Sequence, residues 1–229
     1  MLPSLEAGGA SIVEIGFPFS DPIADGPVIA AAMHEALMQG STPLSVLAEV
    51  AAARSKTNLG IVAMVSISIV LRIGVRKMVE QAERAGIDGF ILPDLPLEES
   101  DELIGAIRER GLTASLLIAP STTAERAERI AKASSGFVYL LARAGITGES
   151  QEAPDIGGRV RMLRGITNLP IACGFGISTA EHVRAVVEHA DAAIVGSALV
   201  RRLGIAHAEG RSAVAEAAMF TSELAKGLR

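Results

Sequence analysis

The chain has 229 residues, a formal net charge of −5 and a pI near 5.5, and 49% of its residues are hydrophobic. The length suits one large barrel better than two domains, and the acidic balance argues against a nucleic-acid-binding surface. The single cysteine, Cys173, excludes an internal disulfide and favours a reducing cytoplasm. The sequence has no long uncharged apolar span and no leader-like start, so we expect neither membrane insertion nor secretion.

Strand-like apolar runs alternate with helical patterns along the chain. We predict strands over 11–16, 60–66, 88–92, 113–118, 136–141, 169–173 and 191–195. We predict helices over 29–38, 42–54, 74–86, 98–110, 123–133, 157–166, 179–189 and 207–226, with a short extra helix over 197–203. Such alternation with short connections is typical of parallel strands joined by right-handed crossovers. The pattern predicts an α/β fold with seven strands in one domain over residues 1–229.

A carboxylate interrupts the first predicted strand. Glu14 lies in the apolar run Ile12-Val13-Glu14-Ile15, and a run of this kind is typical of a strand that is buried on both faces. Burial raises the pKa of a carboxyl group toward neutrality, which suits a residue that both donates and accepts protons. For Glu14 taken alone, a buried ion pair with an arginine is an alternative explanation.

A second carboxylate follows in a loop rich in proline and glycine. Asp25 lies in Asp21-Pro22-Ile23-Ala24-Asp25-Gly26-Pro27, where the fixed φ of proline and the freedom of glycine allow its carboxylate to stay more solvated and ionised than that of Glu14. Taken alone, Asp25 is also explained as the cap of a helix that starts near Val28. Together, at a strand end and the loop that follows it, the two residues favour a catalytic pair.

Three glycine-rich loops follow later predicted strands, at 145–148, 174–178 and 196–197. Glycine lets backbone N–H groups approach an anion closely, and the start of a following helix adds the positive end of its dipole. In barrel enzymes the loops after the last two strands often bind a phosphate, together with a short extra helix. Tight turns also need glycine, but three such loops in one fold indicate a phosphate site.

Six motifs occur in the order and spacing of one known family. They are EIGFPFSDPIADGP at 14–27, PDLP at 93–96, APST at 119–122, GITG at 145–148, GFGIS at 174–178 and GSA at 196–198. On these motifs the chain resembles the tryptophan synthase α chain. The resemblance implies a (β/α)8 TIM barrel and a retro-aldol lyase that cleaves indole-3-glycerol phosphate to indole and glyceraldehyde 3-phosphate, with no metal or organic cofactor.

The resemblance also implies roles for individual residues. Glu14 would shuttle protons, and Asp25 would accept a hydrogen bond from the indole N–H. Phosphate binding falls to Gly148, Gly176, Gly196 and Ser197, and pocket contacts fall to Tyr139, Thr147 and Phe175. A structural hydrogen bond is an equally good explanation for Tyr139. The implied partner is a β chain in an α₂β₂ tetramer, docked on a loop, 17–22, that we expect to expose apolar residues.

Two departures from the family accompany these matches. The first eight residues correspond to the end of the family's first barrel helix, so the first of its eight strands has no counterpart among the seven predicted here. We expect either a start recorded too late or an open or partner-completed barrel with two unpaired strand edges. Ser66 and Ser68 stand where the family usually has tyrosine and asparagine, which predicts a wider pocket floor.

Two other functions are compatible with the sequence. One is another phosphate-binding barrel isomerase or synthase, which would share the glycine loops but would not need the pattern of Glu14 and Asp25. The other is a truncated, weakly active or non-catalytic subunit that only regulates a β chain.

Overall fold

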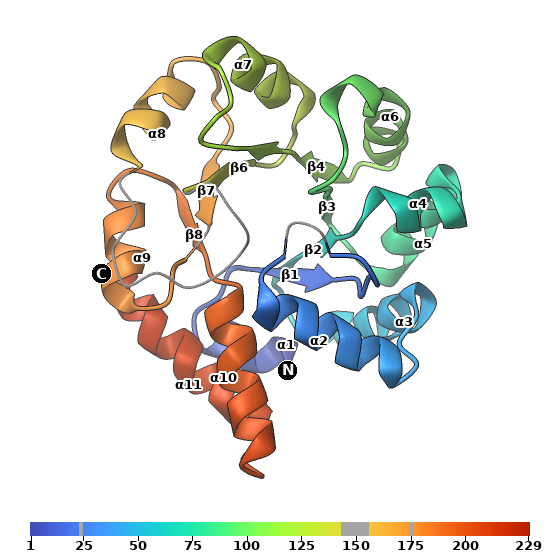
Figure 1. Ribbon diagram of the computed structural model, residues 1–229, viewed down its shortest axis with the longest axis vertical. Coiled ribbons are helices and arrows are strands. Elements are labelled where there is room, and N and C mark those ends of the chain that lie inside the picture. The colour runs from blue at the N-terminus through green and yellow to red at the C-terminus, as the bar shows by residue number, and fades with distance from the viewer. Residues whose placement is uncertain (23–24, 143–155, 175) are drawn as a thin grey trace.

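The computed structural model describes residues 1–22, 25–142, 156–174 and 176–229. In these residues, short parallel strands surround a common centre and helices lie outside them (Figure 1). The strands are β1 (Ile12–Gly16), β2 (Gly60–Met64), β3 (Gly89–Ile91), β4 (Thr113–Ser115), β5 (Leu117–Ile118), β6 (Val138–Leu141), β7 (Ile171–Gly174) and β8 (Ala192–Ile194). This arrangement confirms the predicted α/β barrel class.

Helices cover the outer face of the ring of strands (Figure 1). They are α1 (Leu2–Ala7), α2 (Pro27–Met38), α3 (Pro43–Arg54), α4 (Ile67–Ile73), α5 (Val75–Ala85), α6 (Asp101–Glu109), α7 (Ala124–Ala133), α8 (Gly157–Arg164), α9 (Ala180–Val187), α10 (Ser197–Ala208) and α11 (Ala213–Ala225), with 3-10 turns η1 (Leu97–Glu99) and η2 (Lys226–Leu228). None of the helices in the described ranges is both long and apolar enough to cross a membrane.

Two predicted helices at the C-terminal end have the wrong bounds. The extra helix predicted over 197–203 is α10, which continues to Ala208, and the last helix starts only at Ala213. Gly210 has a φ of +69°, which breaks the helical path at little cost because glycine has no Cβ. The side chain of Ser212 then accepts a hydrogen bond from the N–H of Ala215 and starts α11.

The strand predicted over 113–118 is interrupted at Leu116. β4 pairs only with β3 and β5 pairs with β6, which gives two parallel sheets in the orders β1-β2-β3-β4 and β5-β6-β7-β8. At the break, the N–H of Leu116 donates to Ser134 Oγ at 3.3 Å, and the N–H of Ala114 donates to Ser135 Oγ at 3.0 Å. Side-chain hydroxyls thus accept from the N–H groups there, while the carbonyls of Ala114 and Leu116 still accept from the backbone N–H groups of Ser135 and Tyr139. Because β4 and β5 occupy one strand position, the described ring has the seven positions that were predicted.

β1 ends one sheet and β8 ends the other, and no pairing joins these two strands among the described residues. Ile12, at the start of β1, is 49% exposed. All three residues of β8 are partly exposed, whereas those of β3 are buried. These two edges agree with the expectation of unpaired strand edges.

The two faces of the strands contribute to different apolar clusters. Side chains alternate between faces along a strand. Ile61 and Ala63 of β2 belong to the main core between the strands and the helices, whereas Val62 belongs to a separate cluster with Ile91 and Tyr139. That second cluster marks the inner face of the ring.

Candidate functional site

Glu14 lies on the inner face of the ring. Its neighbours Val13 and Ile15 pack against the main core outside the strands. In the parallel pairing of β1 with β2, Glu14 is the register partner of Val62, which is an inner-face residue. Since register partners point to the same face of a sheet, the carboxyl group of Glu14 points toward the centre of the ring.

Burial makes Glu14 a group that titrates near neutral pH. Although part of the residue is exposed, desolvation raises the pKa of its carboxyl group from 4.5 to about 7. No described residue forms an ion pair with Glu14, so the alternative of a buried ion pair has no support within the described ranges. Near pH 7 both protonation states are populated, as a proton donor and acceptor requires.

Tyr139 lies within electrostatic range of both predicted catalytic residues. It is 8% exposed on β6, between Leu117 and Ala172 in the pairing register. Desolvation raises the pKa of its hydroxyl well above 10, and the negative charges of Glu14, Cys173 and Asp25 raise it further. Electrostatic interaction of this kind requires proximity. The structure therefore brings Glu14, Asp25 and Tyr139 together.

Gly174 provides the space that the phenol of Tyr139 occupies. A Cβ at Gly174 would lie 2.7 Å from Tyr139 Oη and 3.1 Å from Ile194 Cβ. The first contact is closer than van der Waals packing permits, and the second is unusually tight. The first glycine of the GFGIS motif therefore serves the packing of the pocket.

Asp25 lies in the loop between β1 and α2 and is partly buried. Its backbone N–H donates to the carbonyl of Pro22 at 3.1 Å. The N-cap of α2 is Gly26, with no side-chain cap, so the structure assigns the capping position to a residue other than Asp25. The greater solvation expected for its carboxylate stays a prediction.

Two of the predicted phosphate loops follow neighbouring strands. In the parallel pair of β7 and β8, Gly174 is the register partner of Ile194, and Gly176 and Gly196 each come two residues later. They therefore follow the same edge of the sheet. Gly176 has a φ of +84°, a conformation that favours glycine.

The start of α10 leaves backbone donors for a ligand. Ser197 is its first residue and is 8% exposed, and Gly196 is its N-cap without a side-chain cap. In contrast, the side chain of Thr179 caps α9 by accepting a hydrogen bond from the N–H of His182. The first-turn N–H groups of α10 thus have no capping side chain, which suits an anion.

Thr147, Gly148 and Phe175 lie outside the described residues. Their predicted contacts with the phosphate and the pocket stay predictions.

Sequence reasoning named Tyr139 as a pocket residue but missed the other apolar residues of the inner face. Val62, Ile91 and Tyr139 form the buried part of this cluster, and partly buried members include Met64, Leu117 and Ile194. These strands are apolar at almost every position, so hydrophobicity alone does not distinguish the inner from the outer face. Counting alternate positions from Tyr139 along the predicted strand would have found Leu141 and Phe137, but the other members require the pairing register.

Ser66 has a structural role that the sequence did not reveal. It is the N-cap of α4, which was not predicted, and it donates to Asp94 Oδ2 at 2.6 Å. The N–H of Ile67 donates to Asp94 Oδ1 at 2.9 Å. The loops that follow β2 and β3 are therefore joined at the mouth of the ring. The wider pocket floor expected from Ser66 and Ser68 stays a prediction.

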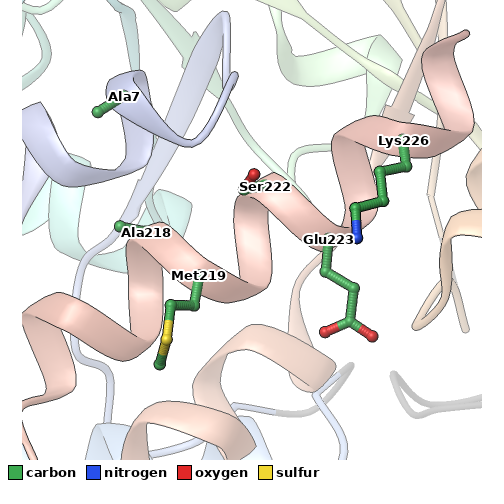
Figure 2. A pocket seen from close by; sticks show the side chains of 6 residues that line it. All are labelled: Ala7, Ala218, Met219, Ser222, Glu223 and Lys226. Carbon is green, nitrogen blue, oxygen red and sulfur yellow. The ribbon is translucent and has the colours of Figure 1, made fainter.

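A hollow outside the ring contains none of the predicted site residues. Figure 2 shows its lining, which is Ala7 of α1, Ala218, Met219, Ser222 and Glu223 of α11, and Lys226 of η2. Across the described ranges, no group of three His, Cys, Asp or Glu side chains converges on a metal position.

Comparison with known proteins gives one consistent family. The family model described as tryptophan synthase alpha chain matches residues 1–229. The tryptophan synthase alpha chain of Synechococcus sp. (strain CC9902) is 45% identical over 228 residues, which cover 99% of this chain and 84% of that relative. Tryptophan synthase subunit alpha from Legionella pneumophila str. Paris has a TM-score of 0.89 at 31% identity, covering 98% of this chain and 84% of that chain. Mycobacterium tuberculosis tryptophan synthase in space group F222 has a TM-score of 0.89 at 35% identity, covering 100% and 85%.

Proposed function

Because the chain belongs to the tryptophan synthase alpha chain family, and is thereby an α-type lyase that cleaves indole-3-glycerol phosphate, we propose that Glu14 and Asp25 carry out this cleavage on the inner face of the ring. The single observation that carries the proposal is the position of Glu14: it faces the centre of the ring, close to Tyr139, with a pKa of about 7.

Retro-aldol cleavage requires two proton transfers. Indole C3 gains a proton, the side-chain hydroxyl loses one, and the C–C bond between them breaks to release indole and the aldehyde. Glu14 can donate in its neutral form and accept in its ionised form, and the two forms interconvert easily near neutral pH. As C3 is protonated, positive charge develops on the ring nitrogen. A carboxylate at Asp25, accepting a hydrogen bond from the indole N–H, stabilises that charge.

The apolar inner residues provide the rest of the pocket. We assign the planar indole ring to the cluster around Val62, Ile91 and Tyr139, because burying an aromatic ring against branched aliphatic side chains stabilises the complex and excludes water from the reacting bond. At the edge where β7 and β8 end, Gly176 and the uncapped start of α10 at Ser197 support a phosphate site. The glycerol phosphate chain would connect these two regions.

The partner of this family is a β chain, and we propose an α₂β₂ tetramer. The expectation that the loop 17–22 exposes its apolar residues is wrong for Phe17, which is 1% exposed, whereas Phe19 is partly exposed and packs against the main core. Docking on this loop would therefore use its other residues. Mass measurement by light scattering of the chain mixed with a β chain checks the stoichiometry. We also propose a cytoplasmic location, supported by the single, buried cysteine.

The test of the proposal is the replacement Glu14→Gln, because an amide of nearly the same shape cannot exchange the proton. We expect substrate binding to persist and indole release to fall by at least about a hundredfold. Glu49→Gln, at an exposed position on α3, controls for the loss of one negative charge. A Glu14→Gln protein that retains half of the parent's turnover would refute the proton-transfer role.

The same assay separates the rival functions. A phosphate-sugar isomerase would convert its substrate without releasing indole. A subunit that only regulates a β chain would release no indole, whether alone or in the complex. Detection of equal amounts of indole and glyceraldehyde 3-phosphate from the parent protein contradicts both rivals.

A further inference from the structure

A buried hydroxyl without a partner faces the inside of the ring. Ser115 of β4 is 0% exposed and is the register partner of Ile91, which belongs to the inner cluster. Its side chain is therefore on the inner face. Ser115 Oγ has no hydrogen-bond partner among the described residues. Leaving a hydroxyl buried and unpaired is unfavourable and uncommon in native proteins.

The neighbouring buried serine behaves differently. Ser134 is 6% exposed, and its hydroxyl donates to the carbonyl of Ile130 at 2.9 Å and accepts from the N–H of Leu116 at 3.3 Å. Both residues lie near the break between β4 and β5, yet only the hydroxyl of Ser115 points into the ring without a partner. The missing partner is thus a feature of Ser115 itself and not of every buried serine in this part of the chain.

Short side chains occupy inner positions on β7 and β8, two strands of the other sheet. TIM barrels usually fill their interiors with bulky branched residues. Here the inner positions in register with Tyr139 on β7 and β8 are Ala172 and Ala192, and the next inner position on β7 is Gly174. The phenol of Tyr139 takes up the space at Gly174, and the hydroxyl of Ser115 adds a polar point beside the apolar Ile91.

We propose that Ser115 is a specificity-determining residue, whose hydroxyl forms a hydrogen bond with a polar substituent on the benzo ring of the indole. The inference rests on the proposed function, in which Glu14 and Asp25 engage the pyrrole ring. β4 lies across the ring of strands from β1, which carries Glu14 (Figure 1). The benzo ring, directed away from Glu14, is therefore the part of the substrate that faces Ser115. The expected ligand class is an indole with a hydroxyl or amino group on this ring.

The test uses the condensation direction, in which indole C3 attacks the aldehyde carbon of glyceraldehyde 3-phosphate. Indole and the four hydroxyindoles with the hydroxyl on the benzo ring are compared as substrates of the parent, Ser115→Ala and Ser134→Ala. Because a hydroxyl at one fixed point can reach only one ring position, we expect one isomer to be favoured. For that isomer, the ratio of its kcat/KM to that of indole should fall about tenfold in Ser115→Ala and stay at the parental value in Ser134→Ala.

A stability measurement tests the same inference independently of substrate. Replacing an unpaired buried hydroxyl by hydrogen removes no internal hydrogen bond, so Ser115→Ala should keep or raise the Tm, whereas Ser134→Ala should lower it. An unchanged selectivity ratio in Ser115→Ala, or a fall in Tm as large as that of Ser134→Ala, overturns the inference. If the parent does not condense indole itself, the proposed function fails, and this inference fails with it. Condensation of indole without discrimination among the isomers overturns the role of Ser115 alone.

Discussion

Replacement of Glu14 by glutamine should make the protein more stable at alkaline pH. The pKa of the Glu14 carboxyl rises from 4.5 to about 7 on folding because the group is desolvated. Each pH unit of such a difference corresponds to about 1.4 kcal/mol. Ionised Glu14 therefore destabilises the folded state by up to about 3 kcal/mol, and the partial exposure of the residue makes this an upper bound.

The sign of the effect follows from proton binding in the two states. Below pH 4.5 the carboxyl is protonated in both the folded and the unfolded chain, so parent and variant differ little. Between pH 4.5 and about 7 the folded state holds more protons than the unfolded state, and the parent loses stability as the pH rises. Well above pH 7, where the carboxyl is ionised in both states, the loss is complete. Glutamine does not titrate, so the free energy of unfolding of the variant increasingly exceeds that of the parent over this pH range. Above the range the difference stays constant.

Urea unfolding followed by circular dichroism, at intervals from pH 4 to pH 8.5, measures the difference directly. Other titrating groups contribute equally to both proteins and cancel in the comparison. Glu49→Gln, at an exposed position on α3, serves as the control and should follow the parent at every pH. If the free energies of unfolding of parent and Glu14→Gln differ by the same amount at pH 4 and pH 8, the carboxyl is not desolvated and the argument for its proton role loses its basis.

Three further substitutions test the surroundings of the site. Gly174→Ala should lower both the folding stability and indole release, because the new Cβ would lie 2.7 Å from Tyr139 Oη. A second change, Tyr139→Phe, removes this hydroxyl and should restore part of the folding stability. A double variant no more stable than Gly174→Ala would contradict this contact. Gly176→Val should strain a backbone at a φ of +84° and weaken the binding of glycerol phosphate, measured by calorimetry. The control Gly40→Ala, at an exposed position, should weaken it far less. Equal affinity of Gly176→Val and the parent would exclude Gly176 from the proposed phosphate site. Glu216→Gln should lower the urea midpoint more at pH 7 than at pH 3, because hydrogen bonds from two arginines depress the pKa of this buried carboxyl and their contribution to stability decreases as the pH falls. An equal decrease at both pH values would argue against an ionic contribution.

Local features of the sequence were sufficient for the fold class and the family. The alternation of apolar runs with helical patterns and the short connections between them depend on neighbouring residues, so a parallel barrel with seven strand positions could be predicted. The role proposed for Glu14 was also suggested locally, because a carboxylate in an apolar strand is unfavourable to bury. The predicted bounds of the last two helices were wrong because a local signal was overlooked. Gly210 ends one helix and Ser212 starts the next.

Only the tertiary structure decided which side chains share the interior. The sequence of a strand that is apolar on both faces does not show which face points into the ring. Pairing between segments far apart in the sequence determines which face that is. The register of Glu14 with Val62, the contact of Tyr139 with Gly174, and the inward position of Ser115 all depend on such pairing. The pKa of Glu14 depends on it as well, because desolvation is produced by the groups that surround a carboxyl in space and not by its neighbours in the chain.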